Sequence, residues 1–394
     1  MSARRKVQAD LQAPAAAAVA GAVPWDLQRA PRIPVARPRL APLEAALPYL
    51  RRIDAARIYS NFGPLNALFE QRLCAQFGLD EGSVVTCNNA TMGLTMALQA
   101  AAGRYGGYCV MPAWTFAATA HAALAAGLTP FLVDVDAVTG ALTPQIAARA
   151  LAAAPGRVGA VLPVAPFGLP LDLDAWDAFS ARHNVSVVAD AAAGFDGLRP
   201  GKLPAVVSLH ATKVLGIGEG GFVVSTDPAV IADIRRRANF GFDGQRDASL
   251  VGGNGKLSEY AAAYGLAALD LWRLHRIEYQ AVAAYYRAAL RDAPGLRLAP
   301  GLGDEWICST FCIEAAPPAL AEIELRLTQA EIATRRWWGK GLHGQRAFRA
   351  LPRTALRTTD RLAASTLGLP CWPGISVEAL DEVVSIVLDV LGRT

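Results

Sequence analysis

The chain has 394 residues, of which 53% are apolar, so it can bury a large core and more than one domain. Its formal net charge is only +4, and its Lys and Arg residues form no basic stripe, which argues against a nucleic-acid-binding protein. No uninterrupted run of about 18 strongly apolar residues occurs, so we expect no transmembrane helix and no membrane association.

The six cysteines lie among apolar neighbours and form no metal-binding pattern. Cys308 and Cys312 are four residues apart, but no second pair or nearby histidine completes a metal site. We therefore expect buried free thiols, no bound metal and a cytoplasmic protein.

The first residues only weakly resemble a secretory signal. A basic start precedes an alanine-rich stretch over residues 14–23, but Gln8, Asp10 and Gln12 interrupt the segment. Alanine is also a poor substitute for the leucines of a signal peptide. We therefore expect a flexible Ala/Pro-rich arm over residues 1–33.

From about residue 60 onward, segments with helical spacing alternate with short apolar runs. The helical spacing predicts helices over residues 65–77, 90–102, 115–127 and 172–183. The apolar runs predict strands over residues 83–87, 107–113, 129–136, 158–164 and 185–190. Several of these strands are continuously apolar, which is typical of a parallel or mixed sheet covered by helices on both faces.

After Asp190 the pattern changes. Two predicted strands, 205–211 and 220–226, are separated only by a short lysine- and glycine-containing segment, and a long helical region follows over 258–291. The later pattern is looser and predicts a strand over 306–315 and helices over 320–329 and 377–391. We place a domain boundary near residues 290–300, where the pattern loosens.

The segment between the two later strands contains Gly216, Gly218 and Gly221, which match the G-x-G-x-x-G spacing of a dinucleotide-binding turn. Such a turn must open a helix, but here a strand follows, so this interpretation fails. A loop of small residues between two strands is instead suited to presenting the amine of Lys213 to a carbonyl group. The alternative is an ordinary exposed lysine.

Seven short motifs follow one another along the chain. They are 61–64 (NFGP), 90–94 (ATMGL), 112–116 (PAWTF), 133–136 (VDVD), 190–192 (DAA), 208–213 (SLHATK) and 218–221 (GEGG). Each is weak alone, but in this order and spacing the set resembles the DegT/DnrJ/EryC1/StrS family of sugar aminotransferases. The resemblance spans about residues 34–390.

This resemblance implies an α/β protein with the fold type I architecture of pyridoxal-phosphate-dependent transferases. We expect a large domain over residues 34–290, with a mostly parallel seven-stranded sheet between helices, and a smaller α+β domain over residues 291–394. The implied cofactor is pyridoxal 5′-phosphate. The implied partners are an amino-acid donor, a nucleotide-sugar acceptor and a second copy of the chain that completes the active site.

The resemblance also implies two catalytic residues. Lys213 would hold the cofactor covalently and, once released, move a proton on the substrate. Asp190 ends a predicted strand, where ligands collect in open α/β sheets, and would keep the pyridine nitrogen protonated so that the ring withdraws electrons. The alternative for Asp190 is an ordinary helix N-cap.

Further cofactor-binding positions follow from the same motifs. Thr91 and the Met92 amide lie at a predicted helix start, which favours a phosphate. Ser208 resembles a second phosphate-side hydroxyl, Phe116 the aromatic ring that stacks on the cofactor, and Ala192 the small residue on the opposite face. The alternatives are a capping threonine at position 91 and a core aromatic at position 116.

The chain departs from the family pattern at two positions. Ala193 stands where the family often has a Gln or His that contacts the ring hydroxyl. Lys256 stands where an Arg or Asn reaches the neighbouring subunit's cofactor phosphate, and it keeps a charge but lacks the guanidinium fork. His210 is open to two interpretations, a satisfied core histidine or a residue near the cofactor.

Residues 334–343 (TRRWWGKGLH) occupy the place where the family builds its substrate mouth. Their cationic and aromatic side chains suit a nucleotide diphosphate and a stacked base. The alternative is a surface turn with buried tryptophans. The side chains in question are Arg335, Arg336, Trp337, Trp338 and His343.

We therefore predict an aminotransferase that moves an amino group, from glutamate, to the C4 keto group of a nucleotide-linked deoxysugar. Alternatives are a family member that aminates C3 or modifies the sugar in another way, and a cofactor-binding regulatory protein with low turnover. Dehydrating relatives replace the lysine by histidine, so Lys213 argues against that branch.

Overall fold

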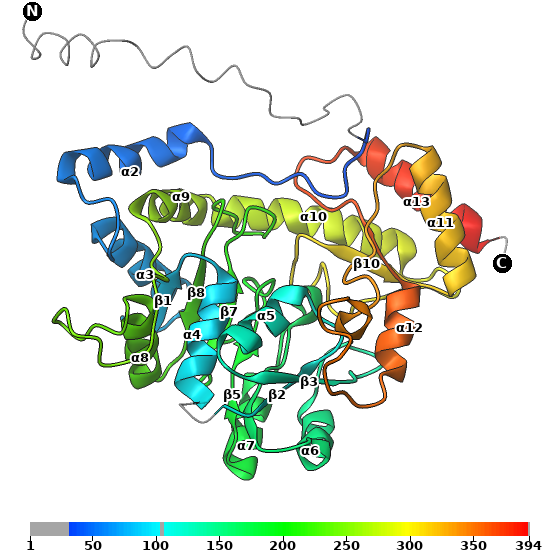
Figure 1. Ribbon diagram of the computed structural model, residues 1–394. Coiled ribbons are helices and arrows are strands. Elements are labelled where there is room, and N and C mark those ends of the chain that lie inside the picture. The colour runs from blue at the N-terminus through cyan, green and yellow to red at the C-terminus, as the bar shows by residue number, and fades with distance from the viewer. Residues whose placement is uncertain (1–30, 103–105, 393–394) are drawn as a thin grey trace, which may run out of the picture.

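The computed structural model describes residues 31–102 and 106–392 (Figure 1). The predicted arm lies outside the described residues except for its last three. Of these, Ile33 is buried and pairs with Ile332, which belongs to the C-terminal part of the chain. Within the described residues, no helix combines the length and the apolar character that crossing a membrane requires.

The central strands form two four-stranded sheets that adjoin. One has the order β3 (Thr129–Val133), β2 (Tyr108–Pro112), β4 (Val158–Val161) and β5 (Ser186–Val187), all parallel. The other has the order β1 (Val84–Cys87), β8 (Gly221–Val224), β7 (Ala205–Ser208) and β6 (Ala189–Asp190), in which only β6 and β7 are parallel.

The two sheets meet because β5 and β6 are consecutive pieces of one extended segment. Val188 donates to the Val161 carbonyl at 3.0 Å, and Asp190 donates to the Pro163 carbonyl at 2.8 Å, so the segment follows the end of β4 and the residues directly after it. The expected mixed, mainly parallel α/β architecture is confirmed. The sequence predicted a single seven-stranded sheet, whereas the structure has these two adjoining sheets.

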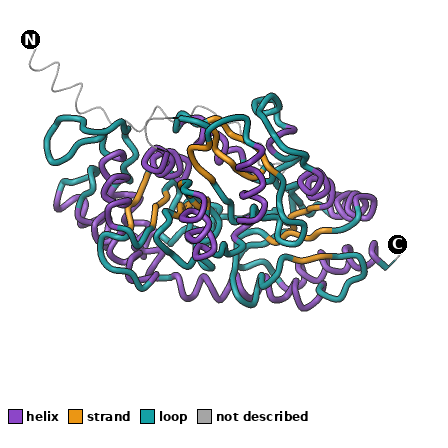
Figure 2. The backbone as a smooth tube through the Cα atoms, turned by 90° about the horizontal axis from the view of Figure 1, so that it is seen from below, coloured by secondary structure: helices purple, strands orange, loops and turns teal. Residues whose placement is uncertain are grey.

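Helices cover both faces of the strands (Figures 1 and 2). Val206 and Val223 pack with α4 (Ala90–Ala102) and α8 (Pro228–Ala238), whereas the neighbouring residues Val207 and Phe222 pack with α3 (Pro64–Phe77) and α9 (Glu259–Asp270). Because successive side chains of a strand point to opposite faces, a strand buried on both sides must be apolar throughout.

The long helical region predicted over 258–291 is two helices, α9 and α10 (Trp272–Leu290), which meet at Leu271. After α10 comes a small antiparallel sheet with β10 (Phe311–Glu314) between β9 (Arg297–Leu298) and β11 (Thr366–Leu369). With α10, α11 (Pro317–Gln329) and α13 (Val377–Leu391), this sheet encloses a hydrophobic core of its own. The domain boundaries stay a prediction.

Several helices were not predicted, namely α2 (Leu43–Ala56), α6 (Pro144–Ala153), α8 and α12 (Arg357–Ser365). The apolar faces of three of them are narrow, because α8 and α12 are rich in arginine and polar residues, and α6 buries mainly alanines. Tertiary contacts rather than a wide apolar stripe stabilise these helices.

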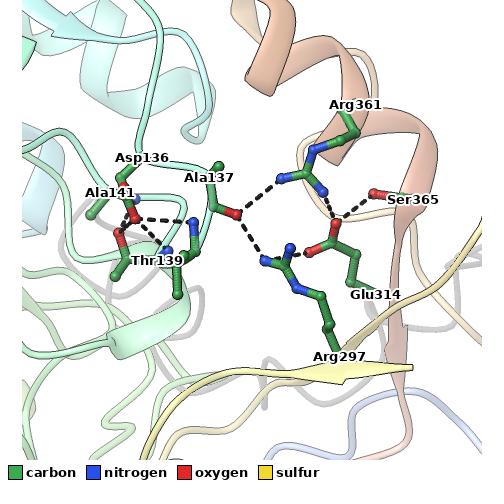
Figure 3. A network of polar contacts seen from close by, with 9 residues as sticks. Asp136, Ala137, Thr139, Ala141, Arg297, Glu314, Arg361 and Ser365 are labelled. Atoms are coloured by element: carbon green, nitrogen blue, oxygen red, sulfur yellow. Dashed lines mark hydrogen bonds and ion pairs between the residues drawn. The ribbon is translucent and has the colours of Figure 1, made fainter. Parts of the chain in front are cut away.

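A polar network joins the turn after β3 to the C-terminal sheet (Figure 3). The Asp136 carboxylate accepts from the Thr139 amide and hydroxyl at 2.8 and 2.9 Å and so fixes the turn that presents the Ala137 carbonyl. That carbonyl accepts from Arg297 at 2.8 Å and from Arg361 at 3.0 Å. Glu314 forms an ion pair with both arginines, so their charges are partly neutralised where the two parts of the chain meet.

Candidate active site

The ends of several strands bring the predicted site residues to one edge of the sheets. β6 ends at Asp190, β7 ends at Ser208, and the loop after β2 leads into α5 (Ala117–Ala125). The Ser208 amide donates to the Ala192 carbonyl at 3.2 Å, which holds the two strand ends side by side. This edge is where open α/β sheets bind ligands.

Asp190 is a buried carboxylate with only 4% of its surface exposed. Its Oδ2 accepts from the Thr119 hydroxyl at 2.9 Å, and its Oδ1 accepts from the Ala192 amide at 3.1 Å. Burial raises the pKa of Asp190, whereas these two hydrogen bonds and the nearby charge of Lys213 lower it. Within the described part of the chain Asp190 forms no ion pair, so its buried charge still lacks a direct cationic partner.

Lys213 is half-buried in the tight loop between β7 and β8. Its amide donates to the His210 carbonyl at 2.8 Å, and the Ala211 amide donates to the Gly218 carbonyl at 2.8 Å. A Cβ on Gly216 would lie 2.6 Å from the Ala211 carbonyl oxygen, so only glycine fits there. The glycines therefore shape the loop that carries the lysine, and the two strands around it form an antiparallel hairpin.

The start of α4 follows β1 directly and lies beside the first residue of β8. A Cβ on Gly221 would lie 2.8 Å from the Ala90 nitrogen, which shows how closely these backbones approach. The Met92 amide, expected to bind a phosphate, already donates to Asn89 Oδ1 at 2.9 Å. The described residues offer no partner to the Thr91 hydroxyl, so of the two residues Thr91 holds the free donor.

Ser208 ends β7, and His210 lies between this strand and the lysine. Ser208 Oγ accepts from the His210 amide at 3.2 Å, so its own proton is available to another acceptor. His210 is half-buried, and its Nδ1 lies 2.8 Å from the Thr212 hydroxyl and accepts from the Thr212 amide at 3.2 Å. Because Nδ1 accepts, the proton of the neutral ring lies on Nε2, which is 3.7 Å from Glu219.

Phe116 precedes α5, and 61% of its surface is exposed. The alternative that Phe116 is a core residue is therefore wrong. Ala192 is half-buried and directly follows the Asp190 strand. The arrangement leaves a flat aromatic face available to a ligand.

Lys256 lies 4.4 Å above the Phe240 ring, and burial lowers the pKa of its amine. The preceding Gly255 carbonyl accepts from the Asn88 amide at 2.8 Å. This places the segment of Lys256 against the start of α4 in the same chain. Its expected role across a subunit interface stays a prediction.

The predicted substrate mouth is held largely by partners within the chain. Arg336 donates to Glu324 at 2.9 and 2.7 Å, and His343 Nε2 lies 2.8 Å from Asp360. Trp338 stacks on Phe167, with the ring centroids 4.4 Å apart.

Arg335 and Lys340 are both exposed, and the Arg335 guanidinium lies 4.8 Å from the centre of the Trp337 ring. The internal contacts of Arg336, Trp338 and His343 therefore favour the alternative, a surface turn with buried tryptophans, for these three side chains. Ala193, which follows Ala192 in the chain, is half-buried, and its methyl group cannot donate a hydrogen bond.

Sequence reasoning missed two threonines and one cysteine at this edge. Thr115 and Thr119 are almost fully buried and connect to Asp190, and the only available signal was their spacing within PAWTFAAT. Cys308 is buried close enough to Lys213 that the lysine charge opposes the rise in the pKa of its thiol. All six cysteines are free, as expected.

Comparisons with known proteins agree with this geometry. A sequence model of the DegT/DnrJ/EryC1/StrS aminotransferase family matches residues 43–388. The dTDP-4-amino-4,6-dideoxy-D-glucose transaminase of Shigella dysenteriae is 30% identical over 382 residues, which cover 90% of this chain and 98% of that protein.

Solved structures are also similar. A PLP-dependent aminotransferase structure from Bacillus cereus has a TM-score of 0.82 and 30% identity, covering 90% of this chain and 99% of that chain. The structure of DesI in the presence of its TDP-sugar product has a TM-score of 0.82 and 32% identity, covering 92% and 93%.

Proposed function

Because this chain belongs to the DegT/DnrJ/EryC1/StrS aminotransferase family and is a PLP-dependent aminotransferase, we propose that it aminates the C4 keto group of a nucleotide-linked deoxysugar, with glutamate as the donor. The printed activity of the Shigella relative and the TDP-sugar product of DesI support this substrate class. The observation that carries the site assignment is the buried Asp190 carboxylate, which lies near Lys213 and has no ion-pair partner among the described residues.

The residues present fit the cofactor. Pyridoxal phosphate, when bound, supplies a protonated pyridine ring that withdraws electrons from the reacting carbon. Asp190 would accept a hydrogen bond from the protonated ring nitrogen, whose positive charge is the cation that the buried carboxylate lacks. A carboxylate held by two hydrogen bonds is already oriented for this contact.

Lys213 would provide the amine that holds the cofactor. Its free amine would act as the base that moves a proton at the carbon bearing the amino group. The loop around it is fixed by backbone hydrogen bonds and a glycine that no other residue can replace without a clash. The lysine is therefore positioned by the backbone.

The hydroxyl groups of Thr91 and Ser208 are the free donors for the cofactor phosphate, with the amino end of α4 adding its partial positive charge. The exposed ring of Phe116 would cover one face of the pyridine, and Ala192 leaves room on the other. We further propose a cytoplasmic homodimer in which Lys256 serves the partner's phosphate.

The experiment that tests this function has two stages. Purified protein with pyridoxal phosphate and glutamate is first assayed for 2-oxoglutarate, and the aminated enzyme is then offered dTDP-, UDP- and GDP-linked 4-keto and 3-keto sugars. We expect a mass spectrum with an amino group in place of the keto oxygen of a 4-keto sugar. A product only from 3-keto sugars would move the reaction to C3, and cofactor binding without amino transfer would indicate a regulatory protein.

A further inference from the structure

Three buried polar side chains from different elements form a line that ends at Asp190. Thr115 lies in the loop after β2, Thr119 in the first turn of α5, and Asp190 at the end of β6. Thr115 and Thr119 are each 1% exposed. Their hydroxyl oxygens are 2.7 Å apart, and Thr119 Oγ1 is 2.9 Å from Asp190 Oδ2.

The direction of this chain follows from counting protons. An ionised carboxylate can only accept hydrogen bonds, and a threonine hydroxyl has one proton to donate. Thr119 must therefore give its proton to Asp190 and accept from Thr115. Both hydroxyl dipoles point toward the carboxylate, and hydrogen bonds aligned in this way strengthen one another in a water-free interior.

The two carboxylate oxygens are held from different sides. Thr119 binds Oδ2, and the Ala192 amide binds Oδ1 at 3.1 Å. The Ala192 amide belongs to the backbone of the turn directly after β6, so the hydroxyl contact decides the rotation of the carboxylate about its own axis. Thr115 and Thr119 also flank Phe116 in sequence, so the same pair anchors the segment that carries this exposed ring.

We infer that Thr119 is a positioning residue that, with Thr115 behind it, keeps the Asp190 carboxylate charged and correctly rotated for the ring nitrogen of the cofactor. This inference rests on the proposed function, because it concerns the residue that we place against the cofactor. Neither threonine touches the substrate in this scheme, and each acts only through Asp190.

The test measures binding of pyridoxamine 5′-phosphate to the cofactor-free full-length protein by calorimetry. This ligand binds without a covalent bond to Lys213. Thr119→Val keeps the shape but removes the hydroxyl, and we expect its dissociation constant to rise roughly ten- to a hundred-fold, as for loss of a hydrogen bond to a charged group. Thr119→Ser keeps the hydroxyl and should bind within about threefold of the wild type.

The chain offers a matched control. Thr86 is fully buried, donates to Glu70 at 2.9 Å and accepts from Asn66 at 2.7 Å, in the same pattern at a different place. Thr86→Val should lower the melting temperature without changing the dissociation constant. Thr115→Val should raise the dissociation constant less than Thr119→Val does. The double variant should bind pyridoxamine phosphate as tightly as Thr119→Val alone, because Thr115 acts only through Thr119.

Wild-type affinity in Thr119→Val, or an equal loss in Thr86→Val, would overturn the inference. If Thr119→Val does not fold, the dissociation constants of Thr115→Val and Thr119→Ser are compared instead. Thr115→Val should bind pyridoxamine phosphate more weakly than Thr119→Ser, and equal affinities would overturn the inference. Pyridoxamine phosphate binding does not depend on the sugar, so the inference can hold even when every ketosugar fails as an acceptor. Conversely, amino transfer to a ketosugar with unchanged binding in Thr119→Val would leave the proposed function intact and remove the role of Thr119.

Discussion

At the scale of single residues, Asp190 is the side chain whose surroundings most restrict its chemistry. Burial disfavours its charge, while Thr119, Ala192 and the nearby Lys213 favour it. Such an opposition is common where a site is built for a charged ligand rather than for stability. Removing the charge should therefore stabilise the cofactor-free protein and lower the rate of amino transfer.

Asp190→Asn provides a test with a defined pH dependence. Burial raises the folded-state pKa of Asp190, so ionising this carboxyl destabilises the folded protein. The stability of the neutral form is fully present below the ordinary carboxyl pKa and is lost as pH rises through the raised value. The cofactor-free Asp190→Asn protein should therefore melt at a higher temperature than wild type at neutral pH. This advantage should shrink as the pH is lowered, when measured by calorimetry. Amino transfer should fall at the same time, and unchanged turnover would remove Asp190 from the mechanism.

Lys213→Ala gives the second residue-scale prediction. Without the amine, borohydride should no longer attach the cofactor to the protein, and amino transfer should fall by at least about a hundredfold because the proton carrier is lost. Peptide mass spectrometry and the two-stage assay measure these losses. Lys202→Ala is the control, since Lys202 is exposed and precedes β7, at the opposite end of the strand from Ser208. Retained activity in Lys213→Ala would contradict the assignment.

At the scale of elements, the turn after β3 and the C-terminal sheet depend on one acidic residue. Glu314 lies between Arg297 and Arg361, which both donate to the Ala137 carbonyl (Figure 3). Burial and the neighbouring Arg297 lower the pKa of Arg361, which shows that the two cations repel each other. The carboxylate of Glu314 offsets this repulsion.

Glu314→Gln should therefore destabilise the protein. Urea unfolding should show a loss of about 1–2 kcal/mol, reduced from the value for a buried pair because both arginines are more than one-third exposed. Glu382→Gln is the control, because its ion pair with Arg32 is exposed on both sides and its loss should change stability less than Glu314→Gln does. Equal effects of the two substitutions would show that the network adds nothing beyond a surface pair.

At the scale of the whole molecule, the start of α4 is the region that a second subunit would complete. Thr91, Ser208 and the amino end of α4 offer hydrogen-bond donors, but a helix end supplies only about half a positive charge. A cofactor phosphate carries more negative charge than that. A cation from the partner would balance the difference, and Lys256 is our candidate.

Subunit exchange tests this shared site. Lys213→Ala and Lys256→Glu proteins should each be nearly inactive alone. Mixed and allowed to exchange, they should regain activity, because one site of each heterodimer carries both intact residues. Light scattering and mass spectrometry of tagged subunits confirm the exchange. An active monomer, or no recovery despite exchange, would refute the proposal.

The order of the motifs in the sequence correctly predicted the family, the fold class, the enzyme activity and the cofactor. These properties are readable because each motif is a local segment with a strict backbone requirement, such as the glycine loop around Lys213. Strongly apolar strands and helices with wide apolar faces were also predicted, because their apolar spacing is visible within a short stretch of sequence. Helices α6, α8 and α12 escaped because their stability comes from distant contacts.

Only the tertiary structure determined which polar groups find each other. Thr119 binds Asp190 across 71 positions of sequence, and Arg336 of the expected substrate mouth is already paired with Glu324. The Met92 amide is satisfied by Asn89, which leaves Thr91 as the free donor. Residue spacing sets which groups are near along the chain, whereas the partner of a buried polar group depends on where the folded chain brings distant elements together.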